Sequence, residues 1–150
     1  METIEQKKRR LIGKQYLPVY LTELNKLIKN VVVADDLLSI QDSDNIYSTV
    51  FSDEPIDRFT TSFEKKDRLK ILFESIESAE SLKYILFTAY SHECGAIRIG
   101  SLVNFNVDFD FDDEHSGLII LISNNLLQKI LLDFYEEGGE RYIDVEIYRK

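Results

Sequence analysis

Apolar and polar side chains alternate without a break over residues 103–112, the segment VNFNVDFDFD. Successive side chains of a β-strand point to opposite faces of its sheet, so this pattern predicts a strand with one buried and one solvent face. Residues 142–148 alternate in the same way, and the apolar run 118–122 predicts a more deeply buried strand. Because the short turn-like segment DDEHSG, which begins at Asp112, joins residues 103–112 to residues 118–122, we expect these two strands to pair antiparallel.

The first third of the chain is predicted to be helical. Apolar residues recur at helical spacing before Pro18 and again after it. Proline has no backbone N–H and clashes with the preceding turn, so Pro18 is expected to kink the helix or to divide it in two. The residues expected on the buried helix face are Ile4, Leu11, Ile12, Leu21, Leu24, Ile28 and Val31.

A third helix is predicted from Thr61 to about residue 78. Thr61 and Glu64 have the spacing of a capping box, in which each side chain satisfies a backbone N–H at the start of a helix. Short apolar strands are expected before and after this helix, within residues 46–51 and 83–90. The apolar stripe of the helix consists of Leu69, Leu72, Phe73 and Ile76.

A last helix is predicted over residues 124–136, where apolar residues again recur at helical spacing. Gly138 and Gly139 follow it, and glycine commonly ends a helix. Helices early in the chain and strands later are typical of the α+β class. We therefore predict a single α+β domain over residues 1–150, with N-terminal helices, a mainly antiparallel sheet and a C-terminal helix-strand unit.

Charge limits the partners that the chain can bind. Its 18 basic and 27 acidic residues give a net charge of −9. Residues 1–14 carry five basic and two acidic side chains, whereas the rest of the chain carries 13 basic and 25 acidic ones. A strongly anionic body opposes binding to nucleic acid and to anionic membranes, so we expect neither partner. A charged partner should be basic.

Little in the sequence indicates catalysis or a cofactor. The chain has one cysteine, Cys94, and therefore no intramolecular disulfide, and the apolar run 118–122 is far too short for a membrane span. Both features favour the cytoplasm. A calcium-binding loop that started at Asp108 would require glycine at position 113 and glutamate at position 119, but the chain has Asp113 and Ile119 there. We therefore expect neither a metal nor another cofactor.

Two acidic segments are the predicted partner-binding regions. Residues 35–57 contain seven acidic residues and no basic one, and residues 108–114 place carboxylates on the polar face of the expected strand. Nearby tyrosines would supply apolar anchors, while the carboxylates would steer a basic partner. The residues predicted to bind are Asp35, Asp36, Asp42, Asp44, Asp53, Glu54, Asp108, Asp110, Asp112, Asp113 and Glu114.

These features together resemble the small acidic immunity proteins of bacterial polymorphic-toxin and contact-dependent inhibition systems. The resemblance lies in the acidic segment 35–57, the segment DFDFDDEHSG, the α+β order, the lone Cys94 and the lack of a catalytic set. It implies a non-enzymatic protein-binding module that neutralises a basic, nuclease-like toxin domain. It carries over no individual residue, because these proteins share no motif to match.

Two other classes of function stay open. A regulatory or adaptor protein, or a protein that mimics nucleic acid, would have a similar sequence and differ in its partner. A small hydrolase would use the segment His92 to Cys94, with His92 or His115 activating the Cys94 thiol. Exposed strand edges or a tyrosine-rich face are also compatible with a homodimer.

Overall fold

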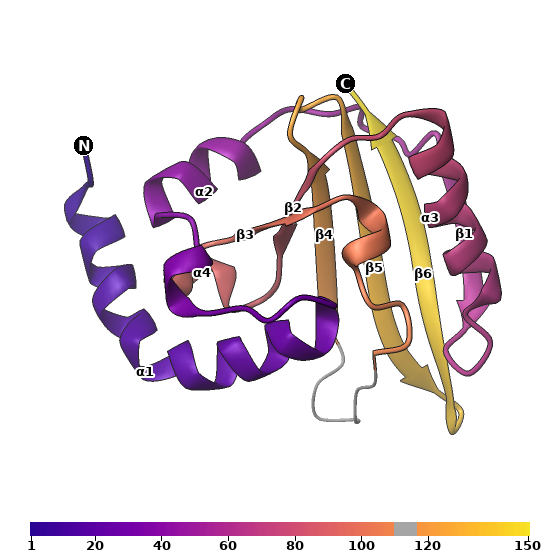
Figure 1. Ribbon diagram of the computed structural model, residues 1–150, viewed down its shortest axis with the longest axis horizontal. Coiled ribbons are helices and arrows are strands. Elements are labelled where there is room, and N and C mark those ends of the chain that lie inside the picture. The colour runs from indigo at the N-terminus through magenta and orange to yellow at the C-terminus, as the bar shows by residue number, and fades with distance from the viewer. Residues whose placement is uncertain (110–116) are drawn as a thin grey trace.

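The computed structural model describes residues 1–109 and 117–150. Within this part of the chain six strands form one antiparallel sheet in the order β1-β6-β5-β4-β2-β3, and the helices come mainly from the first half (Figure 1). The predicted α+β class is thereby confirmed. The strands are β1 Asp57–Ser62, β2 Tyr84–Phe87, β3 Ile97–Gly100, β4 Gly117–Ser123, β5 Gln128–Glu137 and β6 Glu140–Arg149. The helices are α1 Ile4–Leu27, α2 Ile40–Tyr47, α3 Asp67–Ala79 and α4 Ser91–Cys94, with single 3₁₀ turns at Ala34–Asp36 and Leu102–Asn104.

The N-terminal helix α1 is continuous and contains Pro18, so the proline does not divide it. A capping box begins the helix: Gln6 N donates to Thr3 Oγ1 at 3.0 Å, and Thr3 N donates to Gln6 Oε1 at 2.9 Å. The predicted buried stripe is right for Leu24 and Ile28. It is wrong for Ile4, Leu11 and Ile12, which are exposed because α1 packs through a different face. It is also wrong for Val31, which is exposed beyond the end of α1.

The face of α1 that packs carries Gly13 and Tyr20, and it lies against α4. The Tyr20 hydroxyl donates to the Gly95 carbonyl at 2.7 Å and lies 3.0 Å from Ser91 Oγ, and burial strongly raises the Tyr20 pKa. Gly13 permits this close approach, because a Cβ there would overlap the carbonyl oxygen of Glu93. The apolar spacing in the sequence does not predict this packing face of α1, because Arg9 and Gly13, which are not large apolar residues, lie on it.

The strand predicted over residues 103–112 is wrong for its described part. Residues 102–104 form a 3₁₀ turn, and the following backbone bonds to the end of α1, where Asn106 N donates to the Leu27 carbonyl at 2.7 Å. The alternation of burial holds from Phe105 to Phe109, which are both buried, with Asp108 exposed between them, but Val103 is exposed. β4 pairs with β2 and β5, so the expected pairing with residues 103–112 is also wrong for that part.

The helix predicted over residues 124–136 is wrong: most of it is strand β5. Gly138 and Gly139 have φ of +62° and +81°, and they join β5 to β6 in a two-residue hairpin instead of ending a helix. The predicted C-terminal helix-strand unit is therefore a β-hairpin. Leucines and isoleucines in this segment fit a helical spacing, but Ile130, Leu132 and Phe134 also alternate with more exposed residues, and cross-strand pairing with β6 decides between the two patterns.

Two other boundaries differ from the prediction. The helix α3 begins at Asp67, and Thr61 belongs to β1, so no capping box forms between Thr61 and Glu64. The strand expected over residues 46–51 is also wrong, since residues 46 and 47 end the helix α2. Strands β2, β4 and β6 confirm the predictions for residues 83–90, 118–122 and 142–148.

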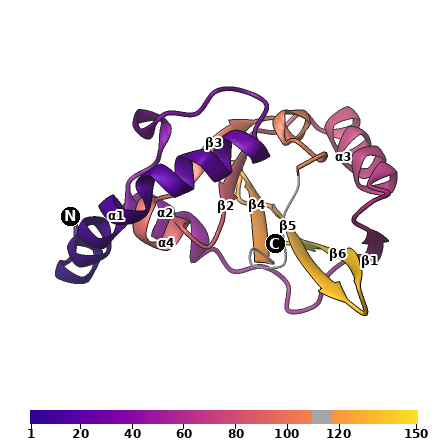
Figure 2. The same ribbon diagram turned by 90° about the horizontal axis from the view of Figure 1, so that it is seen from below.

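The two faces of the sheet are covered unequally. The larger core lies between the sheet and α1, α3 and residues 102–109 (Figure 2). On the other face a smaller cluster packs side chains of β2 and β4, such as Ile85 and Ile122, against Leu38 and Ile46 from the segment around α2. Among the described residues, no helix is long and apolar enough to cross a membrane.

We predict that Gly13→Ala destabilises the fold. Alanine at an ordinary helix position is more stable than glycine by roughly 0.5–1 kcal/mol. At Gly13 the added methyl group meets the Glu93 carbonyl, so we expect a loss of about 1–3 kcal/mol, the usual range for overpacking. Urea unfolding measures the change, and Gln15→Ala on the exposed side of α1 is the control. A Gly13→Ala protein as stable as the control would contradict the close α1–α4 contact.

Candidate functional site

The outer face of β5, β6 and β1 carries a polar surface, which we call the open face. Its side chains alternate with the core-facing ones, and they lie opposite one another across the three strands. Tyrosines and carboxylates dominate it. The open face consists of Arg58, Thr60 and Ser62 from β1, Tyr142, Asp144, Glu146 and Tyr148 from β6, and Lys129, Leu131, Asp133 and Tyr135 from β5.

Asp144 is held by two hydroxyl groups. Thr60 Oγ1 donates to Asp144 Oδ1 at 2.6 Å, and Tyr135 Oη donates to the same oxygen at 3.0 Å. Hydrogen bonds from two neighbouring strands fix the side-chain rotamer, so this carboxylate is held in place before any partner arrives. A similar arrangement holds Glu146, which accepts from Arg58 Nη2 and Tyr148 Oη, each at 2.9 Å.

Asp133 lies directly opposite Asp144 in the β5–β6 register. Partial burial raises the Asp133 pKa, and the nearby carboxylates of Asp144 and Glu146 raise it further. Like charges opposite one another on adjacent strands destabilise a sheet, so this pair costs the isolated protein free energy. A cation placed between the two carboxylates would remove the repulsion.

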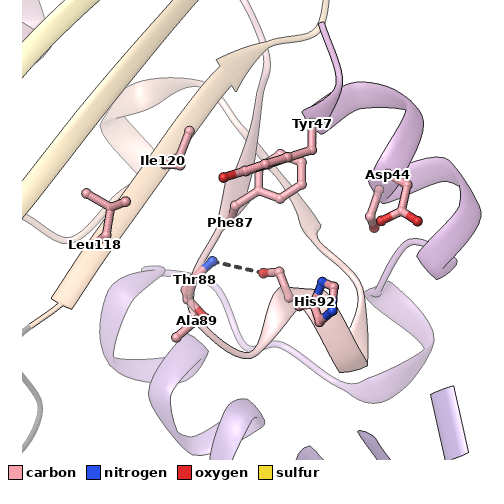
Figure 3. Close-up of a pocket in the computed structure, with 10 residues that line it drawn as sticks. Asp44, Tyr47, Phe87, Thr88, Ala89, His92, Leu118 and Ile120 are labelled. Atoms are coloured by element: carbon pink, nitrogen blue, oxygen red, sulfur yellow. Dashed lines mark hydrogen bonds between the residues drawn. The ribbon is translucent and has the colours of Figure 1, made fainter. Parts of the chain in front are cut away.

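A pocket of about 400 Å³ borders the open face at β4 (Figure 3). Tyr47 and Phe87 form an aromatic wall, with ring centroids 5.4 Å apart and planes at 58°. Leu118 and Ile120 contribute an aliphatic wall from β4. The remaining lining residues are Ser43, Asp44, Thr88, Ala89, Ser91 and His92.

Asp44, one of the predicted binding residues, is bonded within the fold. Arg9 Nη2 and Nη1 donate to its two carboxylate oxygens at 2.7 and 2.9 Å, and Gln6 Nε2 donates at 2.9 Å. The Arg9 hydrogen bond lowers the Asp44 pKa, and Asp44 in turn raises the Arg9 pKa. This ion pair joins α1 to α2, and the Arg9 side chain is only 10% exposed. Asp44 therefore stabilises the contact between the two helices.

Cys94 lies where α1 meets α4. Its Sγ donates to the Gly13 carbonyl at 3.3 Å, and burial, followed by the Glu93 charge, raises the thiol pKa. A raised pKa disfavours the thiolate, which is the nucleophilic form. His92 is exposed and lines the pocket, whereas His115, its suggested alternative, lies outside the described residues.

The predicted acidic residues lie on separate elements. Asp35 and Asp36 are exposed on the 3₁₀ turn Ala34–Asp36, and Asp42 is exposed on α2. Asp53, Glu54 and Asp108 are also exposed. Burial and then the hydrogen bond to Glu146 raise the pKa of Tyr148 on the open face, and the charge of Glu54 adds a smaller contribution. Asp110, Asp112, Asp113 and Glu114 lie outside the described residues.

Sequence reasoning missed Asp133 and Asp144 as a pair. The alternation over residues 142–148 predicts the polar face of β6, but the helix predicted over residues 124–136 contains Asp133, and from a helix Asp133 could not pair with Asp144 across two strands. The signal was present: two runs of alternating residues flank Gly138 and Gly139, and a glycine pair is typical of a two-residue hairpin.

Within residues 1–109 and 117–150, no group of three or more His, Cys, Asp or Glu side chains is arranged to hold a metal ion. Comparison of the chain with known proteins found no matching family model, no matching curated protein and no matching solved structure.

We predict that Asp44→Asn destabilises the protein by about 1–3 kcal/mol at neutral pH, because Arg9 loses its charged partner. The pKa of Asp44 is lowered on folding, so its contribution is complete above the ordinary aspartate pKa and is lost as pH falls through the lowered pKa. Urea unfolding at neutral and acidic pH tests this. Exposed Asp53→Asn is the control, and an equal effect of both substitutions would contradict the structural role of Asp44.

Asp133→Asn is predicted to act in the opposite direction. Removing one of two facing charges should stabilise the sheet by about 0.2–1 kcal/mol at neutral pH. The Asp133 pKa is raised on folding, so its protonated form favours the fold at low pH, and that benefit is lost as pH rises through the raised pKa. The gain from Asp133→Asn should therefore shrink in acid. Thermal unfolding against Asp108→Asn measures it, and a loss of stability at neutral pH would count against the repulsion.

Proposed function

We propose that this protein is a non-enzymatic binding module that neutralises a basic protein domain, as the small acidic immunity proteins do. The observation that carries the proposal is the facing pair Asp133 and Asp144 on the open face of the sheet. The pair costs stability in the isolated chain, and a basic side chain from a partner would turn that cost into binding free energy.

The rest of the open face has the composition of an interface. Tyr135, Tyr142 and Tyr148 are partly exposed, and tyrosine buries a large area on binding while losing little conformational entropy. The net charge of −9 adds long-range attraction, which can raise association rates to about 10⁸–10⁹ M⁻¹s⁻¹ at low salt. A basic nuclease-like domain fits this combination, because carboxylates would take the place of its substrate phosphates.

The carboxylate pair also resembles the acid and base pairs of some enzymes, in which the environment separates the two pKa values. Catalytic pairs, however, work in clefts from which water is largely excluded. Asp133 is exposed on the sheet surface, which favours contact with a protein over chemistry on a small substrate. The raised pKa of Cys94 likewise gives no support to the hydrolase alternative. An adaptor would use the same surface for a different partner.

Affinity capture from the native host tests the proposal. The tagged protein should retain a basic protein at low salt and lose much of it at high salt, because screening shortens the range of the attraction. Asp133→Lys should abolish the capture, since it replaces the acceptor by a like charge. Glu74→Lys, which changes the net charge equally at an exposed position of α3, should leave most of it.

Neutralisation is tested by expressing the captured protein in a sensitive cell. The wild-type chain should restore growth, and Asp133→Lys should not. Capture of no basic protein, or equal loss with Asp133→Lys and Glu74→Lys, would overturn the proposal. Capture without any effect on the partner's activity would identify an adaptor instead.

A further inference from the structure

The pocket and the carboxylate pair lie on one line across the sheet. Leu118 of β4 is opposite Asp133, Asp133 is opposite Asp144, and Asp144 is opposite Thr60. Leu118 also lines the pocket. Neighbouring strands are about 4.8 Å apart, so Asp133 and Asp144 lie roughly 5 and 10 Å from the Leu118 strand. An apolar pocket is thus followed by two acidic acceptors in a single row.

The walls of the pocket suit an aromatic side chain. Tyr47 is 58% exposed and Leu118 is 41% exposed, so both keep apolar surface accessible at the pocket. A cavity of roughly 150 Å³ already holds benzene, so a pocket of about 400 Å³ has room for one aromatic side chain. The tilted pair Tyr47 and Phe87 offers ring edges and faces, with which a third ring can make favourable contacts.

The spacing of the row matches an extended chain. Alternate residues of a strand are about 6.6–6.8 Å apart and point to the same side. A ring seated beside Leu118 therefore places the side chain two residues away over the gap between Asp133 and Asp144. Arginine fits that place best, because its planar guanidinium can donate to two carboxylates at once.

We propose that this row binds an extended segment with the pattern aromatic-x-arginine, with the ring in the pocket and the guanidinium between Asp133 and Asp144. The inference deepens the proposed function, on which it rests, by naming the feature of the basic partner that the surface recognises. Glu146 lies two residues from Asp144 on the same face of β6, where Arg58 pairs with it, so the two carboxylates offered to the arginine are those of Asp133 and Asp144.

The test is an NMR titration of the full ¹⁵N-labelled chain at low salt with the capped peptide Gly-Ser-Phe-Thr-Arg-Ser-Gly. Saturable shifts are expected at the backbone amides of Tyr47, Phe87, Leu118 and Asp133. Replacing the peptide arginine by glutamine should weaken binding about tenfold, the effect of losing one charge-assisted pair. Replacing the phenylalanine by alanine should weaken it by a similar factor.

Two variants locate the peptide. Ala89 is exposed and lines the pocket, so Ala89→Trp should block the ring site and abolish the saturable shifts, whereas exposed Val31→Trp should leave them. With Asp133→Asn, the preference for the arginine peptide over the glutamine peptide should shrink, because only Asp144 remains as a charged acceptor. Absence of saturable shifts, shifts that persist in Ala89→Trp, or equal binding of the phenylalanine and alanine peptides would overturn the inference.

The peptide titration and the affinity capture can fail independently, so failure of the pocket inference can be distinguished from failure of the proposed function. A basic protein whose capture depends on Asp133 but is unchanged by Ala89→Trp would retain the proposed function and overturn the pocket inference. Specific peptide binding by a chain that captures no basic protein from its host would retain the pocket inference and overturn the function.

Discussion

The cross-strand register of the hairpin β5–β6 is the constraint on which the rest of the structure depends. Each strand has ten residues, and the two-glycine turn aligns every pair between them. The register directs Ile130, Leu132 and Val145 into the larger core. The same alternation directs Asp133 and Asp144 outward, where they face one another. A shift by one residue would exchange the two sets, so core burial holds the two charges together.

Unequal covering of the sheet then separates structural and candidate functional surfaces. The segment around α2 covers the outer side of β2 and β4 with a small apolar cluster, and Phe51, which follows α2, extends this cover to Lys129 and Leu131 of β5. It leaves Asp133 exposed and the outer side chains of β6 partly exposed. The pocket lies at the border between these areas, because Leu118 of β4 lines it while pairing with Asp133 of the open face. The apolar pocket and the acidic open face are therefore adjacent, because the segment around α2 ends its cover of the sheet between them.

The acidic residues of the chain do not all serve one purpose. Asp44 has the same charge as Asp133, but Arg9 and Gln6 occupy its oxygens and α1 is thereby joined to α2. Folding lowers the pKa of Asp44 and raises that of Asp133. The opposite directions of the two pKa shifts show that the charged form of Asp44 stabilises the fold, whereas the charged form of Asp133 destabilises it. The net charge of the chain does not distinguish these two roles, because each aspartate contributes the same charge to it.

The sequence by itself determined the α+β class, the strands β2, β4 and β6 and the acidic character of the surface, because local alternation and charge are properties of neighbouring residues. Only the tertiary structure decided that residues 128–137 form a strand, that residues 104–106 bond to the end of α1 and the residues after it, and that Asp133 faces Asp144. Short apolar segments satisfy helical and strand spacings equally well, and the choice between them depends on hydrogen bonds to distant segments. The candidate site is made of such long-range pairs, which no local pattern records.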